Sequence, residues 1–207
     1  MGNINAPFGL RPVRHLNGMS WNGQTERCYI HASYAQALYV GDPVMLQTET
    51  DYQDTTGKHL SIMLAPGTDD TPILGVITSF EPLASDTTKN YNPASTQRYA
   101  NVCIDPSVIY HVRDDGSAVP TKLLCGQNAN LVAGTASTAT GLSGYKLDLT
   151  TPAANDSFTV LILKVAGIED NTLAIYAIWE VLINQHQLER LSTSDGTPVG
   201  MLGVTAT

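Results

Sequence analysis

Short apolar runs, separated by turn residues, recur along the chain. Three of them are rich in β-branched and other apolar side chains and cover residues 37–46, 60–65 and 73–80. Gly41-Asp42-Pro43 interrupts the first run, where Pro43 fixes φ and Gly41 can take the positive φ of a sharp corner. Runs of this length between turn signals are typical of strands and too short for helices. The pattern therefore predicts the strands of a β-sandwich or β-barrel.

The same pattern predicts further strands before and after these three. They are expected over residues 26–32, 99–104, 107–113, 145–149, 158–166 and 173–183. In the first of these, alternation places Cys28 and Ile30 on one face and Arg27, Tyr29 and His31 on the other. We count about nine to eleven strands and expect no long helix. The predicted fold class is all-β, a single compact β-barrel or β-sandwich body.

Polar and glycine-rich stretches separate the predicted strands. Residues 84–97 have no apolar period, which predicts a surface loop. Loops are also expected over residues 126–130 and 134–144. Residues 121–125 fit either one helical turn or a strand.

The two ends of the chain differ from this body. Residues 1–24 sustain no periodic pattern, yet they carry Phe8, Leu10 and Trp21, which are too apolar for a solvated tail. Three interpretations stay open: a terminal segment packed on its own domain, an extended arm on a neighbouring subunit, or disorder. A tail rich in Gly, Thr and Ser ends the sequence and is either flexible or a second arm. We divide the chain into an extended N-terminal arm (1–24), a β-rich body (25–191) and a C-terminal tail (192–207).

The charge balance narrows the class of partner. The chain has 11 Lys and Arg against 19 Asp and Glu, a formal net charge of −8 at pH 7. Its basic residues are scattered, whereas binding to a phosphate backbone requires clustered cations. A protein partner is therefore expected rather than a nucleic acid.

Cysteine usage and hydropathy bear on the compartment. The three cysteines lack CxxC spacing and no signal peptide is apparent, which predicts free, reduced, mostly buried thiols in a protein made in a cytoplasm. The longest apolar stretch, residues 158–168, is interrupted by Lys164 and Gly167 and is too short to span a bilayer. No membrane partner is expected.

Known catalytic motifs are missing from the sequence. It has no P-loop, dinucleotide-binding, G-x-S-x-G or H-E-x-x-H motif. The five histidines lie one per segment, which favours structural or surface roles over metal ligation. The carboxylate pairs Asp69-Asp70 and Asp114-Asp115 occur at turns, where both side chains are expected to be solvated. We therefore predict that the protein is not an enzyme, with no catalytic or metal-binding residue and no cofactor.

Six stretches of the chain share their order with the motifs of one family. They are Ala6–His15, Tyr39–Val44, Ile73–Val76, Gly126–Leu131, Leu142-Ser143 with Leu147-Asp148, and Ile183–Gln187. Together they resemble the capsid decoration, or cement, proteins of tailed-bacteriophage heads. The resemblance implies a β-tulip-like body on the outer surface of the virion's expanded capsid, after synthesis in the bacterial host cytoplasm. It also implies a homotrimer whose N-terminal arm clamps the major capsid protein.

Two groups of residues would then make the contacts. We expect the arm to bind the capsid through prolines, apolar side chains and guanidinium groups, namely Pro7, Phe8, Leu10, Arg11, Pro12 and Arg14. Prolines pre-extend the arm, which lowers the entropy lost on docking. Asn184 and His186 end a long strand, where they form either a polar network at a subunit interface or a strand end capped by polar side chains.

Three other functions stay open. In the first, the chain is another virion component, such as a minor head, connector or tail protein, and its copy number per particle would reveal this. Alternatively, it is a surface adhesion or sugar-binding module, which requires exposed aromatic side chains with polar neighbours. The third alternative is a hydrolase with a dispersed site, which activity and metal content would reveal.

Overall fold

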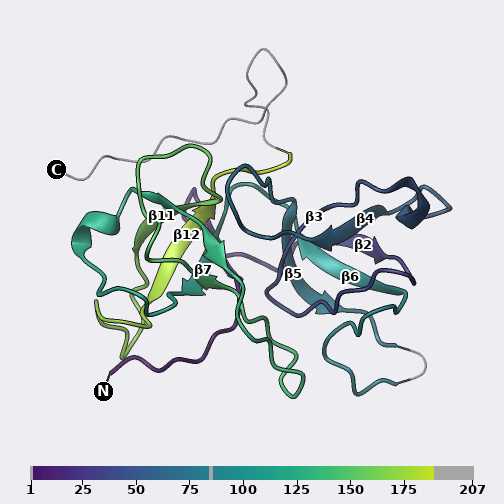
Figure 1. Ribbon diagram of the computed structural model, residues 1–207, viewed down its shortest axis with the longest axis horizontal. Coiled ribbons are helices and arrows are strands. Elements are labelled where there is room, and N and C mark those ends of the chain that lie inside the picture. Colours follow the sequence, from purple (N-terminus) through teal and green to yellow (C-terminus); the bar gives the residue numbers. More distant parts are fainter. Residues whose placement is uncertain (1, 84–85, 189–207) are drawn as a thin grey trace, which may run out of the picture.

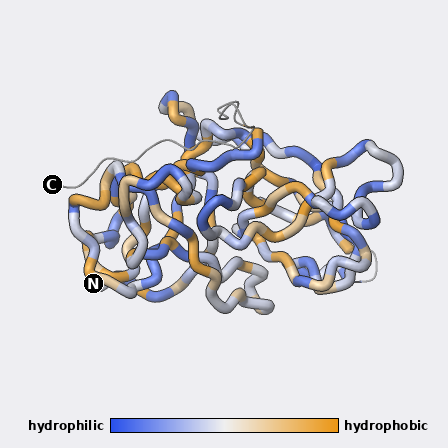
Figure 2. The backbone as a smooth tube through the Cα atoms, turned by 45° about the horizontal axis from the view of Figure 1, so that its top comes forward, coloured by the Kyte–Doolittle hydropathy of each residue, from blue (hydrophilic) through white to orange (hydrophobic). Residues whose placement is uncertain are grey.

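The computed structural model describes residues 2–83 and 86–188, which form two β-rich halves (Figure 1). The barrel half lies on the right of this view and the sheet half on the left. Figure 2 shows apolar backbone segments running through both halves, with hydrophilic segments in outer loops. The all-β fold class that the hydrophobic pattern predicts is confirmed.

A closed five-stranded barrel makes up the first half. In barrel order, its strands are β2 (Glu26–Ile30), β4 (Leu60–Leu64), β3 (Pro43–Leu46), β5 (Gly75–Phe80) and β6 (Arg98–Cys103). β2 closes the barrel because it pairs parallel with β4 and antiparallel with β6. Inward-pointing side chains such as Cys28, Ile30 and Ile77 are fully buried in one apolar core. A 3-10 turn, η1 (Thr50–Tyr52), lies between β3 and β4.

A five-stranded antiparallel sheet makes up the second half. Its strands, in order across the sheet, are β1 (Arg11–His15), β7 (Val108–Arg113), β12 (Ile178–Ile183), β11 (Val160–Val165) and β8 (Asn128–Ala129). Trp179 and Tyr110 are its largest fully buried side chains. A short ladder of β9 (Leu131–Val132) and β10 (Lys146–Leu147) and a 3-10 turn, η2 (Lys122–Leu124), complete this half.

The segment after β12 ties the sheet to the barrel. The backbone N of Ile73, just before β5, donates to Gln185 O at 2.8 Å, and Gln187 N donates to Ile73 O at 3.0 Å. Gln187 Oε1 accepts a hydrogen bond from Leu46 N of β3 at 2.8 Å. The two halves therefore share backbone pairing as well as chain connectivity.

Several elements depart from the predicted pattern. β1 forms within residues 1–24, and β8 lies in a predicted loop, because both are specified by pairing with distant strands. β12 begins at Ile178 rather than residue 173, since Tyr176 has a φ of 64°, a left-handed conformation that breaks a strand. The alternative left open for residues 121–125 is decided in favour of a helical turn. The predicted tail, residues 192–207, lies outside the described residues.

The Gly-Asp-Pro corner before β3 is built as predicted. Gly41 has a φ of 94° and its carbonyl accepts a hydrogen bond from Leu10 N at 2.9 Å. Asp42 is buried, and its Oδ2 accepts a hydrogen bond from Tyr39 N at 2.7 Å. Burial raises the pKa of Asp42 from 3.8 to about 6. A proton on Asp42 is therefore bound more tightly in the folded state than in the unfolded state.

This shift predicts a pH-dependent effect of the substitution Asp42→Asn. Because the folded-state pKa is the higher one, the wild type loses stability as pH rises from about 4 through about 6, in total about 3 kcal/mol. The variant lacks this ionisation, so its free energy of unfolding should rise relative to that of the wild type by this amount. Urea unfolding from about pH 4 to about pH 7 measures the difference.

His186 does not obscure this comparison. Burial lowers the pKa of His186 to about 4, which gives a pH dependence of stability of opposite sign. Because the wild type and the Asp42→Asn variant both contain His186, its contribution cancels in the difference between their free energies of unfolding. Asp148→Asn, at a surface turn, should show no such relative gain. Wild-type and Asp42→Asn curves that run parallel over the whole pH range would refute the prediction.

Candidate functional site

The outer face of β2 carries side chains that three strands bring together. Arg27 points outward, opposite to the buried Cys28, as the alternation predicts. The antiparallel register of β2 and β6 pairs Tyr29 with Tyr99. The parallel register of β2 and β4 brings His59, just before β4, beside Arg27. These residues form a continuous surface on the outside of the barrel.

Five aromatic rings follow one another across this surface. We call them the aromatic row: Tyr52, His31, Tyr29, Tyr99 and His59. Successive ring centroids are 5.0, 6.2, 5.7 and 4.9 Å apart. Tyr29 is buried and the other four rings are half-buried. The guanidinium of Arg27 lies 3.6 Å from the centroid of Tyr99, a cation–π contact.

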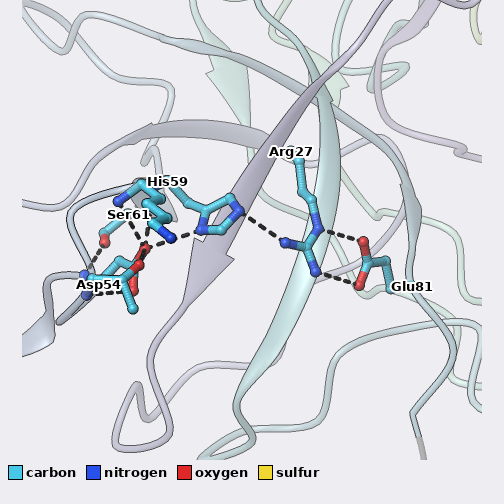
Figure 3. Close-up of polar contacts among 7 residues, drawn as sticks. Arg27, Asp54, His59, Ser61 and Glu81 are labelled. Carbon is cyan, nitrogen blue, oxygen red and sulfur yellow. Dashed lines mark hydrogen bonds and ion pairs between the residues drawn. The ribbon is translucent and has the colours of Figure 1, made fainter.

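A chain of polar contacts crosses the same surface (Figure 3). Arg27 pairs with Glu81 through two bonds, Nε to Oε1 at 2.5 Å and Nη2 to Oε2 at 2.9 Å. Its Nη1 donates to Nε2 of His59 at 2.8 Å, and Nδ1 of His59 donates to Oδ2 of Asp54 at 3.0 Å. The hydrogen bonds between Arg27 and Glu81 lower the pKa of the carboxyl and raise that of the guanidinium. This two-pronged geometry fixes the plane of the guanidinium.

Asp54 anchors the other end of this network. It closes a tight turn, in which Gly57 N donates to Asp54 O at 2.9 Å. Its carboxylate accepts hydrogen bonds from the hydroxyl of Thr56 at 2.7 Å and from the backbone N of Thr56, Lys58 and His59. These bonds, the Thr56 hydroxyl first, hold the pKa of Asp54 well below its usual range. The ionised carboxylate therefore fixes the orientation of the His59 ring.

The geometry suits recognition better than proton transfer. Asp54, His59 and Ser61 are the residue types of a nucleophilic triad. However, Arg27 can only donate, so it occupies the lone pair on Nε2 of His59 while the proton on Nδ1 faces Asp54. Ser61 Oγ accepts a hydrogen bond from Asp54 N at 2.8 Å and makes no described bond to the imidazole. General-base catalysis by His59 would require the Arg27 contact to break first.

The structure places the predicted capsid-binding segment against its own body. Residues 11–15 form β1, which pairs with β7 of the same chain. Leu10 is only 1% exposed and belongs to the core of the sheet half. Arg14 Nη2 lies 2.6 Å from Oε2 of Glu180 in β12. Leu10 and Arg14 are thus engaged in contacts within the chain.

The other residues predicted for the arm lie nearer the surface. They are half-buried or exposed: Pro7, Phe8, Arg11 and Pro12. The guanidinium groups of Arg11 and Arg113 lie 4.7 and 5.9 Å from the ring centroid of Phe8. Deletion of residues 1–16 would remove an edge strand and a core leucine, so side-chain substitutions are the cleaner test of binding by this segment.

Asn184 and His186 lie where the sheet meets the barrel. Each is 1% exposed. Asn184 Nδ2 donates to Phe158 O at 2.8 Å, and His186 Nδ1 accepts a hydrogen bond from Leu188 N at 3.1 Å. This placement fits the interpretation of a strand end with polar side chains. A trimer contact through these two residues would require their exposure.

Sequence patterns identify only one strand of the candidate surface. The outward positions of Arg27, Tyr29 and His31 follow from alternation along β2. The approach of His59 and Tyr99 depends on barrel closure, which joins residues far apart in sequence and leaves no local signal.

The structure also describes the cysteines, the lengths of the helices and the grouping of potential metal ligands. All three cysteines are free, with Cys28 and Cys103 buried and Cys125 exposed. Within residues 2–83 and 86–188, no helix is long and apolar enough to cross a membrane, and no three His, Cys, Asp or Glu side chains gather where they could hold a metal ion. Comparisons of the chain with protein-family models, curated proteins and solved structures found no match.

Proposed function

We propose that the chain is a non-enzymatic structural protein of a tailed-bacteriophage head, which decorates the outer face of the capsid and bridges subunits of the major capsid protein. The surface formed by Arg27 and the aromatic row carries this proposal. Arg and Tyr are enriched at protein–protein interfaces, because planar, rigid groups offer large contact area at a small loss of conformational entropy. The bonds in Figure 3 hold Arg27 and His59 of this surface in place before a partner arrives.

Five of the six stretches that resemble decoration proteins make contacts with one another in space, which supports the proposal. Residue Leu10 of the opening stretch bonds to Gly41 of the Gly-Asp-Pro corner. Val40, at the same corner, pairs with Leu142, and Ile73 pairs with His186. Five of the six stretches therefore have residues at the junction of barrel and sheet, whereas Gly126–Leu131 contains β8 at the edge of the sheet.

The proposed role requires only a modest binding affinity from each copy. Contacts repeated over a closed shell add through multivalency, so a modest affinity per site stabilises the whole head. We propose homotrimers at three-fold positions, as the resemblance implies. A chain with a net charge of −8 also avoids binding to packaged DNA.

Copy number on the head tests this proposal. Purified protein is incubated with expanded heads that lack it, sedimented, and quantified against the major capsid protein. Saturation at hundreds of copies per head supports decoration. Saturation at about six or twelve copies would indicate a connector or tail component instead. No binding would contradict the head assignment.

Substitutions test whether the candidate surface makes the contact. The double variant Arg27→Ala/Tyr99→Ala removes one cation–π pair and should weaken head binding at least about tenfold, or about 1.4 kcal/mol. The matched control is Lys89→Ala/Tyr91→Ala, which removes a cation–π pair elsewhere on the barrel half and should bind like the wild type. Equal binding by both variants would remove the aromatic row from the interface.

One observation favours a second candidate, a sugar-binding module. Tyr52 and Tyr99 are half-buried, so part of each ring is exposed beside polar neighbours, which is the feature that glycan recognition requires. Glycan binding that Tyr99→Ala abolishes, in a protein that does not bind heads, would favour this candidate.

A further inference from the structure

A second surface feature lies where the N-terminal segment meets the barrel. A cavity of about 250 Å³ is lined by the half-buried Phe8 and Pro12 of the N-terminal segment and by the half-buried Val40 and Leu142, while Leu10 and Ile77, which also border it, are buried in the two cores. These walls are apolar. A cavity of roughly 150 Å³ already accommodates a benzene ring, so this one can hold a phenyl or large aliphatic side chain.

Two facing glycines preform this cavity. Gly9 and Gly41 have φ values of 71° and 94°. A Cβ at Gly41 would lie 2.3 Å from Phe8 O, so only glycine permits the two backbone segments to approach this closely. The Leu10 N to Gly41 O bond at 2.9 Å then fixes the N-terminal wall against the barrel wall. A ligand would therefore enter a site that needs little ordering.

Among the described residues, Arg11 is the one charged residue that lines this cavity, and it is exposed. Its guanidinium lies over the Phe8 ring. In the described part of the chain it forms no ion pair, whereas four other cations do: Arg14, Arg27, Lys89 and Lys164. An arginine without a carboxylate beside an apolar cavity is complementary to an apolar side chain with a neighbouring carboxylate.

The edge of β1 near this cavity is covered, which excludes recognition by strand addition there. Trp21 N donates to Val13 O at 3.2 Å, and His15 N donates to Met19 O at 2.8 Å. Residues 19–21 thus fold back over the backbone of β1. A partner segment at this place must be recognised through its side chains.

We propose that this cavity receives a large apolar side chain of the major capsid protein, next to an Asp or Glu that pairs with Arg11. The inference rests on the proposed function for the identity of the partner. The sequence analysis expected the N-terminal arm to extend onto a neighbouring subunit. In this proposal the N-terminal segment instead folds on its own body, and the neighbouring subunit inserts a side chain into the cavity that this segment forms.

Dipeptide titration tests the cavity without any head. Acetyl-Glu-Phe-amide is added to the isotope-labelled full chain and backbone amide signals are followed. We expect shifts confined to the segments that line the cavity, residues 8–13, 21, 40–41, 77–78 and 142, with a Kd on the order of 1 mM. Acetyl-Lys-Phe-amide and acetyl-Glu-Ala-amide should bind at least about tenfold more weakly. In Arg11→Glu, the preference for the acidic dipeptide should disappear. Absence of localised shifts would overturn the cavity proposal.

Head binding tests the partner. Arg11→Glu reverses the charge and Leu142→Trp fills the cavity, and each should weaken head binding at least about tenfold. Lys122→Glu, an exposed cation on η2, is the charge-reversal control and should bind like the wild type. Free energies of unfolding close to that of the wild type confirm that the variants fold.

The outcomes separate the two proposals. Tight head binding by wild type and by both variants overturns the cavity proposal and leaves the decoration function standing. No head binding by the wild type contradicts the decoration function and the assignment of the partner with it. If unbound Arg11→Glu has a lower oligomeric mass in solution than the wild type, while its head binding is unchanged, the cavity binds a second copy of this chain. That outcome overturns the assignment of a capsid partner.

Discussion

Replacement of Asp114 by alanine should lower the free energy of unfolding by roughly 4 kcal/mol. This carboxylate follows β7 and is fully buried. It accepts hydrogen bonds from the backbone N of Tyr176 at 2.6 Å, Ala177 at 2.8 Å and Gly116 at 3.0 Å, and from Nε1 of Trp179 at 3.1 Å. Alanine would leave four donors without this acceptor, of which Ala177 N and Trp179 Nε1 are fully buried.

The loss should also release the backbone before β12. Tyr176 has a φ of 64°, which is unfavourable for an aromatic residue, and the bond to Asp114 stabilises that conformation. Urea unfolding followed by circular dichroism measures the effect. The control Asp148→Ala removes bonds to Thr150 at a surface turn and should lower stability by less than about 1 kcal/mol. Equal losses in the two variants would refute this account of Asp114.

The carboxylate pair Asp114-Asp115 illustrates where the sequence interpretation was wrong. Two acidic residues before a glycine are usually solvated, and Asp115 is half-buried as part of that turn. Asp114 is not solvated, because the turn places it over Trp179 and the start of β12. Burial raises the pKa of Asp114, against the lowering effect of these donors. Only the pairing of β7 with β12, distant in sequence, reveals its role.

Most strands were predictable because alternation and turn residues are local signals. β2, β4, β6, β7 and β11 lie within the predicted ranges to within a residue. β1 was missed because its outward and inward positions are irregular, with a register shift between Pro12 and Arg14. The apolar residues near the N-terminus indicated burial, but not whether the surface that covers them belongs to this chain.

The candidate surface was predictable only in part. Alternation along β2 placed Arg27 outward, yet its partners follow from barrel closure. A parallel contact between β2 and β4 spans a long connection with no helix of the usual crossover kind. Because the histidines lie one per segment, the sequence predicted structural or surface roles for each of them. The arrangement of His59 between Asp54 and Arg27 arises only in the folded chain.

Substitution of Arg98 should destabilise the fold more than substitution of any other basic residue. We expect Arg98→Lys to lower the free energy of unfolding by about 2 kcal/mol. Its guanidinium is buried, and it donates to three carbonyls of the β5–β6 connection: Glu81 at 2.6 Å, Tyr91 at 2.7 Å and Lys89 at 3.0 Å. Burial lowers its pKa. A single ammonium cannot reach three separated carbonyls, whereas the planar fork does.

The loop should loosen together with the loss of stability. Hydrogen exchange should accelerate at Asn92 N and Ser95 N, which bond to Leu38 O and Tyr34 O and so report directly on how the loop is held. The matched control is Arg27→Lys, one strand away. Arg27 contacts the same Glu81, but through its carboxylate and at the surface, where solvent can replace a lost bond. It should therefore change stability little and leave this exchange unchanged. If both variants behaved alike, the loop would depend on charge near Glu81. If only Arg98→Lys accelerates exchange, the loop is held by its backbone carbonyls, and the predicted surface loop is an anchored part of the barrel.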